Sequence, residues 1–333
     1  MPTQFELTKR MHSIEMISKM TRAMQLISSV KMRQSKRLLA EALPYSVHCI
    51  RTMGRILYLT PNLDSPYMRF REKKEGDPWR LDVYLLTGDQ GFDGTYNADV
   101  VAAARRFLKE RVEEIEAQGY VPDITLYLTG SRGRDELLAD GHFIDRDFRF
   151  SIQEPNYAEA EELAEQIFLD YQHRETDEAH LIFSMMHTPV TSSPLYLRLL
   201  PADPEGLRRI INIAVEDPDV KKALPPGFPG ERPTTPFDYP GDIDSLMDHL
   251  FGTYLSGTVY GALVEAYAAE QAARMASMEN ASRNSSELMT ELRDRRNRLR
   301  QSAITSELSE MTASVEAMRH YDLALSGRDR EGK

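Results

Sequence analysis

The sequence has a single cysteine, Cys49, among its 333 residues. This count excludes a disulfide framework, a CxxC redox pair and a cysteine-rich metal site. No run approaches the roughly 18 uncharged apolar residues of a transmembrane helix, and we expect neither a secretory signal nor a transit peptide in the opening MPTQFELTKR. With 41% hydrophobic and 28% charged residues, the chain has the composition of an ordinary globular protein.

Motifs for metal binding and covalent catalysis are also missing. The eight histidines show no HxxxH or HxH spacing, so a zinc site is not expected. There is no GxSxG nucleophile elbow. Cys49 would have to serve as any thiol nucleophile, but it falls in a helical pattern, and we interpret it as an ordinary half-buried helix residue. The sequence therefore predicts no metal and no cofactor.

Charge is distributed unevenly along the chain. The net charge is −11, yet eight lysines and arginines lie between Lys9 and Arg37 against Glu15 alone, a local net of +7. The remainder carries −11 − 7 = −18. The basic stretch could be a solvated face, a nucleic-acid site or a contact for an acidic protein; the lack of aromatics between Phe5 and Tyr45 weakens the nucleic-acid interpretation. A second basic cluster comprises Arg293, Arg295, Arg296, Arg298 and Arg300.

Both ends of the chain are predicted to be long helices. The first covers residues 1–58 and has no Gly or Pro between Thr3 and Pro44, where we expect a kink or a bend. The second covers 244–326, and about 65 of its residues after Gly261 contain neither Gly nor Pro. Such a stretch would extend ~98 Å as one helix, so its length favours a coiled coil or rod.

A seam with a spacing of about 3.5 residues runs along both helices. It is rich in Met, Ser, Ala and Gln and poor in Leu and Ile, which predicts a rod stabilised partly by something around it. In the first helix the seam comprises Leu7, Met11, Ile14, Ser18, Thr21, Gln25, Ser28, Met32, Ser35 and Leu39. In the second it comprises Val264, Ala268, Gln271, Met275, Met278, Ser282, Ser285, Met289, Leu292, Arg296 and Leu299, and then, shifted by about one residue, Ile304, Leu308, Met311, Val315 and Met318.

The segment between the helices has the alternating pattern of an α/β domain. Over residues 79–200 we predict a wound, mostly parallel sheet of Rossmann-like type that forms a knob. The predicted strands are 81–87, 123–129, 143–150, 179–187 and 195–200, and the predicted helices are 99–118 and 157–173. Residues 201–241 contain nine of the 18 prolines, and we interpret them as an extended insertion at the surface.

A glycine-rich loop, Thr87 to Asn97, follows the first predicted strand. It matches neither a Walker loop nor a dinucleotide-binding fingerprint. As a calcium loop it fails, because Gly91 and Val100 occupy ligand positions. A tight turn whose glycines supply positive φ explains it. The alternative is a small phosphate- or metal-dependent enzyme that uses Asp89 and Asp93, with the helices as a dimerisation arm.

Three segments together resemble the gamma subunit of F-type ATP synthases. MHSIEMISKMTRAMQLISSVKMRQSKRL resembles that family's opening helix, and two later segments, ALVEAYAAEQAARMASMENASRNSSEL and RQSAITSELSEM, resemble its C-terminal signature. The loop resembles the family's SSDRGLCGGFN and retains Asp89, Gly91, Gly94 and Asn97. The departures in this loop are Gln90, Asp93 and Thr95.

The resemblance implies a non-catalytic central rotor shaft. The terminal helices would pair as an antiparallel coiled coil inside a hexamer of three alpha and three beta subunits, with the α/β knob at its base, beside the epsilon subunit and the ring of membrane c subunits. Ion flow would turn the ring and shaft and drive ATP synthesis or hydrolysis in the hexamer. The chain would then lie peripherally, at the cytoplasmic face of the plasma membrane.

The resemblance also implies which residues contact partners. Arg300, Gln301 and Thr305 would meet the beta subunits, Met24 would lie opposite them near the collar, and Arg22 stands where the family usually has lysine. The retained loop residues would form the foot beside the ring. The proline-rich insertion is absent from ordinary members and marks a divergent bacterial branch.

Overall fold

A computed structural model describes residues 4–59, 65–189, 191–202 and 243–328 of the chain. Most of the predicted insertion, at 203–241, lies outside the described residues. Helix α1 spans Gln4–Leu59 and helix α7 spans Ile243–Arg328, so both predicted terminal helices form. Pro44 lies inside α1 and does not end it. The chain divides into two compact units, residues 1–24 with 278–333, and residues 25–277.

The second unit contains a five-stranded sheet of order β3-β2-β1-β4-β5. Strands β3, β2, β1 and β4 are parallel and β5 pairs antiparallel with β4, which confirms the predicted mostly parallel sheet. The central strand β1 has five consecutive buried residues, as expected where both faces of a sheet are covered. The elements are β1 Pro78–Leu85, α2 Tyr96–Ala117, β2 Val121–Leu128, α3 Arg134–Ala139, β3 Phe143–Ile144, α4 Tyr157–Gln172, β4 Glu178–Thr188 and β5 Thr191–Leu200.

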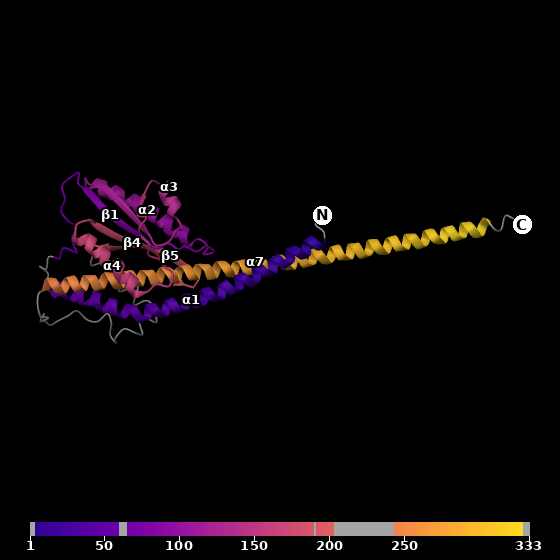
Figure 1. The fold of residues 1–333 in the computed structure, drawn as a ribbon, viewed down its shortest axis with the longest axis horizontal. Helices are drawn as coiled ribbons and strands as arrows, with labels where there is room; N and C mark the ends of the chain where they lie inside the picture. Colours follow the sequence, from indigo (N-terminus) through magenta and orange to yellow (C-terminus); the bar gives the residue numbers. More distant parts are fainter. Residues whose placement is uncertain (1–3, 60–64, 190, 203–242, 329–333) are drawn as a thin grey trace. The chain divides into compact units, whose positions relative to one another are not determined.

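Helices cover both sides of this sheet. Figure 1 shows α2 on one side and the orange part of α7 running along the other. An aromatic contact joins α4 to α7, with the rings of Tyr157 and Tyr260 5.6 Å apart. No helix within the described ranges is long and apolar enough to cross a membrane.

Two elements differ from the prediction. The strand predicted at 143–150 ends after Ile144, because the Asp145 carboxylate accepts the backbone N–H groups of Asp147 and Phe148 and turns the chain. The short helix α3 was not predicted, since six residues are too few for a periodic signal.

Within residues 25–277, α1 and α7 contact each other at several levels. The Cys49 thiol donates to the Leu250 carbonyl at 3.3 Å, and the Lys31 ammonium lies 5.9 Å from the Tyr267 ring centroid. Along these contacts the residue numbers of α7 rise as those of α1 fall, so the two helices run in opposite directions within this unit. Burial raises the pKa of the Cys49 thiol to about 11, which agrees with a packing role rather than a nucleophilic one.

The predicted seam is the buried line of both helices. In the unit of residues 25–277 its buried members are Ser28, Met32, Ser35, Leu39, Val264, Ala268 and Gln271. In the other unit they are Leu7, Thr21, Met278, Ser285 and Leu292. The seam residues after Leu299 are all exposed. The 3.5-residue spacing thus identified the packing line, but that line ends before the shifted stretch from Ile304 to Met318.

Helices α1 and α7 approach each other closely at Gly257 of α7. A Cβ at Gly257 would lie 2.0 Å from the Ser46 hydroxyl and 2.7 Å from its Cβ, whereas a Cβ at Gly252 would have no neighbour within 4 Å. We expect Gly257→Ala to lower the free energy of unfolding by about 1–3 kcal/mol through overpacking. The matched Gly252→Ala should raise it by up to ~1 kcal/mol, because alanine favours helix. Urea denaturation measures both, and equal shifts would contradict the close approach.

Candidate functional site

The glycine loop joins β1 to α2 and packs against the loop that follows β2. The Asp89 carboxylate accepts the backbone N–H of Ser131 at 2.8 Å, and the Arg132 Nε donates to the Asp89 carbonyl at 3.4 Å. Carboxyl ends of neighbouring parallel strands therefore bring these two loops together. Asp89 acts here as a hydrogen-bond acceptor that holds the second loop.

Asn97, in the first turn of α2, ties the two ends of the loop to each other. Its Oδ1 accepts the N–H of Gly88 at 2.8 Å, and its Nδ2 donates to the Asp93 carboxylate at 2.6 Å. Gly94 between them has φ +61°, a conformation that most residues adopt at a cost. The structure thus brings the predicted residues Asn97 and Gly94 together with Asp93 in one turn. Gly94 supplies a positive φ as the tight-turn interpretation expected, whereas Gly88 and Gly91 do not, and the other positive φ of the loop is that of Phe92, at +64°.

A buried ion pair on α7 holds the glycine loop against that helix. The Arg274 Nη2 donates to the Glu270 Oε1 at 2.6 Å, and its Nε donates to the Gly91 carbonyl at 3.2 Å. Gln153 donates to the other Glu270 oxygen at 3.0 Å. Glu270 is 0% and Arg274 3% exposed. A Cβ at Gly88 would lie 2.8 Å from the Glu270 carboxylate, so this approach requires glycine.

Sequence reasoning missed this buried pair, which we call the α7 clamp (Glu270 and Arg274). Arg274 and Gly91 are 183 residues apart, and no local pattern connects them. One signal was available: the clamp residues are an acid and a base four positions apart in an alanine-rich part of the seam helix.

The electrostatics of the loop do not suit a phosphate site. A hollow of about 810 Å³ beside it is lined by four carboxylates, of Asp89, Asp93, Asp135 and Glu136, against the single cation Arg132. Burial raises the pKa of Asp93, with Arg274 and Arg132 opposing it. Within the described ranges, no group of three or more His, Cys, Asp or Glu side chains could hold a metal. The enzyme alternative therefore gains no support from Asp89 and Asp93.

The predicted collar residues all lie in the unit formed by residues 1–24 and 278–333. Arg22, Arg300, Gln301 and Thr305 are exposed and Met24 is half-buried. The Thr305 hydroxyl donates to the Gln301 carbonyl within the helix, at 2.9 Å. In the same unit the Lys19 ammonium pairs with the Glu15 carboxylate at 2.9 Å and lowers the pKa of that carboxyl. The partners of these residues stay a prediction.

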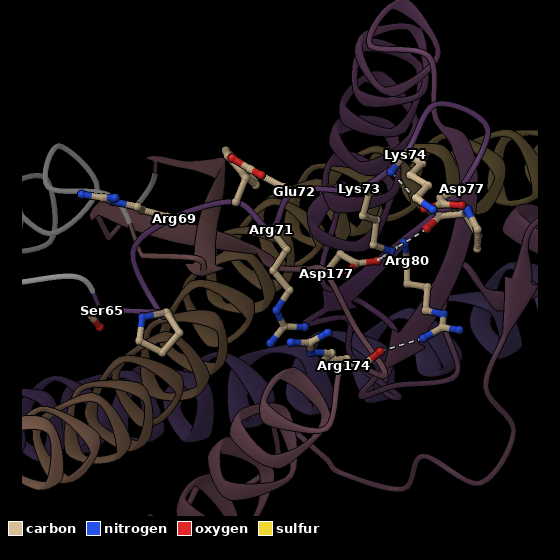
Figure 2. Close-up of a pocket in the computed structure, with 13 residues that line it drawn as sticks. Ser65, Arg69, Arg71, Glu72, Lys73, Lys74, Asp77, Arg80, Arg174 and Asp177 are labelled. Carbon is tan, nitrogen blue, oxygen red and sulfur yellow. Dashed lines mark hydrogen bonds and ion pairs between the residues drawn. The ribbon is translucent and has the colours of Figure 1, made fainter.

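A basic cleft lies elsewhere on the α/β unit and was not predicted. Its walls come from residues 65–80, which lead into β1, and from residues 174–177 after α4, and its volume is about 970 Å³ (Figure 2). Five of its six cations lie between residues 69 and 80, where they alternate with acidic residues and match no known motif, and the sixth comes from the turn after α4. Its cationic side chains are Arg69, Arg71, Lys73, Lys74, Arg80 and Arg174.

Known proteins resemble the chain over almost its full length. The model of the protein family described as ATP synthase matches residues 3–318. The ATP synthase gamma chain of Ruminiclostridium cellulolyticum is 28% identical over 313 residues, covering 94% of this chain and 98% of that protein. The gamma chain of Rubrobacter xylanophilus is 30% identical over 319 residues, covering 94% and 97%. The sodium ion specific gamma chain of Acetobacterium woodii is 28% identical over 315 residues, covering 94% and 98%.

Solved structures share the fold. A chain from the central stalk and c-ring of the Tetrahymena thermophila mitochondrial ATP synthase aligns with a TM-score of 0.50 at 20% identity, covering 79% of this chain and 99% of that one. A chain from the rotor of the Euglena gracilis enzyme aligns with a TM-score of 0.50 at 14% identity, covering 90% and 98%. The family model's match to residues 3–318, with the 30% identity to the Rubrobacter xylanophilus gamma chain, shows that the chain belongs to the gamma-chain family of ATP synthases.

Proposed function

We propose that this chain is the central-stalk rotor subunit that couples ion flow through the membrane ring to ATP synthesis or hydrolysis in an alpha/beta hexamer. Membership of the gamma-chain family supports this function, and the chain would have no catalytic site of its own. The sodium ion specific relative shows that the family includes sodium-coupled members. The complex would be membrane-associated, with this chain peripheral at the cytoplasmic face of the plasma membrane.

The terminal helices form an antiparallel coiled coil in this proposal. The buried seam supports the pairing, because its 3.5-residue spacing is that of supercoiled helices. The contacts of Cys49 with Leu250 and of Lys31 with Tyr267 support the antiparallel direction. The α/β domain would form the foot, next to the epsilon subunit and the c-ring, and the foot loop Asp89, Gly91, Gly94 and Asn97 would face the ring.

The observation that carries the proposal is an exposed apolar face near the end of α7. Ile304, Leu308, Met311, Val315 and Met318 are between 49% and 70% exposed. Regularly spaced apolar residues on one helix face are normally covered by another element. A sleeve of three alpha and three beta subunits would cover this face, while the arginines of both helices would meet acidic groups at its rim.

Purification from the native host tests the rotor assignment. The tagged chain should co-purify with six larger nucleotide-binding subunits for each copy. Native mass determination should give that stoichiometry, and an ATPase assay should show that the complex is active. Recovery of the chain as a monomer or a dimer, with no ATPase, would overturn the proposal. A disulfide between Thr305→Cys, in a Cys49→Ser background, and a cysteine introduced on a surrounding subunit should stop ATP hydrolysis by the complex, and unchanged hydrolysis after cross-linking would contradict rotation.

Charge reversal at the collar should weaken coupling. In the double variant Arg300→Glu, Gln301→Ala, ATP-driven pumping in membrane vesicles is expected to fall at least severalfold, because each charge-assisted contact contributes about 1.5–3 kcal/mol. Arg149→Glu, an exposed arginine of the α/β domain, is the matched control and should pump normally. Unchanged pumping in the double variant would remove Arg300 and Gln301 from the collar.

A further inference from the structure

The basic cleft has a charge opposite to that of the chain as a whole. Six cationic side chains line it against three carboxylates, those of Glu72, Asp77 and Asp177, whereas the whole chain carries −11. Like charges gathered in a concave surface focus the field and attract ions of opposite sign. The cleft therefore has the electrostatic character of a site for an anionic ligand.

Much of the positive charge in the cleft is not neutralised by carboxylates. Arg71 donates to the backbone carbonyls of Thr176, at 3.1 Å, and Tyr171, and its guanidinium lies 4.1 Å from the Tyr171 ring centroid. Arg80 donates to the Arg174 carbonyl at 2.7 Å. These partners are neutral, so both guanidinium groups keep their full charge toward an anion.

A buried carboxylate holds the cleft wall in place. Asp177, 2% exposed, pairs with the Lys73 ammonium and accepts the backbone N–H of Arg80 at 2.9 Å. Lys73 also donates to the Pro78 carbonyl at 2.7 Å. Figure 2 shows Asp177 between Arg71 and Arg80. Groups fixed in this way lose little freedom when an anion binds.

Two further cations remain available for a ligand. Within the described part of the chain, the Lys74 ammonium and the Arg174 guanidinium have no hydrogen-bond or ion-pair partner. Both residues are exposed, and Arg174 has φ +63° in the turn after α4, held by the bond from Arg80 to its carbonyl. Guanidinium groups present paired N–H donors that match the oxygens of a phosphate group.

We propose that this cleft binds a phosphate-bearing anion, with Arg71, Arg80, Arg174 and Lys74 as its cationic donors. The volume of about 970 Å³ lies at the upper end of the range for ligand pockets, so a phosphate group fits with room for the group it is attached to. The anion is either a free phosphate compound or the headgroup of an anionic phospholipid. This site goes beyond the rotor function, and its occupancy does not depend on assembly with other subunits.

Calorimetric titration of the purified full chain with inorganic pyrophosphate tests the free-anion source, and flotation with phosphatidylglycerol vesicles, compared with phosphatidylcholine vesicles, tests the lipid source. The variant is Arg174→Gln with Lys74→Gln, since neither side chain supports the fold through a described bond. The control is Arg146→Gln with Arg149→Gln, which removes the same charge from exposed positions outside the cleft. Circular dichroism checks that both variants fold.

Wild type and control should bind at least one of the two probes alike, and the cleft variant should bind it roughly tenfold or more weakly. Pyrophosphate binding alone would identify a free anion, and selective flotation with phosphatidylglycerol would identify the headgroup; either supports the site. Absence of binding to both probes, or equal weakening in both variants, would overturn it. The proposal would also be overturned if the wild type bound neither probe and the cleft variant failed to assemble with the other subunits, since the cleft would then be a protein contact.

Discussion

Arg274→Met should lower the free energy of unfolding by about 3–5 kcal/mol, because it leaves the fully buried Glu270 carboxyl without its cationic partner. The same change removes the donor to the Gly91 carbonyl, so the glycine loop should also lose its attachment to α7. Urea denaturation of the purified chain measures the first effect. Faster amide exchange confined to residues 88–94 would report the second.

Two variants make this prediction specific to the α7 clamp. Arg283→Met, at an exposed arginine of the same helix, should change the free energy of unfolding by less than about 0.5 kcal/mol. The double variant Glu270→Leu, Arg274→Met should recover much of the loss, since two apolar groups leave no buried charge. A double variant less stable than Arg274→Met would contradict the role assigned to the unpaired carboxylate.

Glu178→Gln is expected to cost a similar amount, about 3–5 kcal/mol. Glu178 is 1% exposed and accepts from the Arg111 Nη2 at 2.6 Å and from the Trp79 Nε1 at 3.1 Å, and its other oxygen lies 2.6 Å from the His180 Nε2. Removing the negative charge leaves the half-buried Arg111 without its buried partner. The matched control is Glu114→Gln, which removes the exposed partner of the same arginine and should cost less than about 1 kcal/mol.

The effect of Glu178→Gln should depend on pH. Burial acts to raise the pKa of Glu178, but His180 and Arg111 outweigh it and lower the pKa to about 2. Because the folded pKa lies below the unfolded value of roughly 4.3, the stabilisation is complete above pH 5 and is lost as pH falls toward 2. The difference between wild type and variant should therefore shrink in denaturation curves recorded at pH 7, 4 and 3. A constant difference would exclude the carboxylate charge as its source.

Regular, local patterns in the sequence were sufficient to predict much of this protein. The 3.5-residue spacing identified the buried seam of α1, from Leu7 to Leu39, and of α7, from Val264 to Leu292. It could do so because the period of a helix fixes which side chains share a face. The alternation of predicted strands with predicted helices indicated a mostly parallel sheet, because parallel strands need crossover connections that are usually helices. The conformation of the glycine loop was also local, since Asn97 reaches both Gly88 and Asp93 within one turn.

Contacts between distant segments were decided only by the tertiary structure. Nothing local links Arg274 to Gly91, or Arg71 to the turn that carries Arg174, and such contacts arise when the chain closes long loops around a shared core. The length of β3 was likewise set by the side chain of Asp145 and not by the apolar run that predicted a longer strand. The sequence by itself determined the helices, the seam, the sheet and the family resemblance, because these depend on periodicity and on motifs. Folding decided the contact of the α7 clamp with the Gly91 carbonyl and the meeting of residues 65–80 with residues 174–177 in the basic cleft, because each brings together segments that lie far apart in the chain.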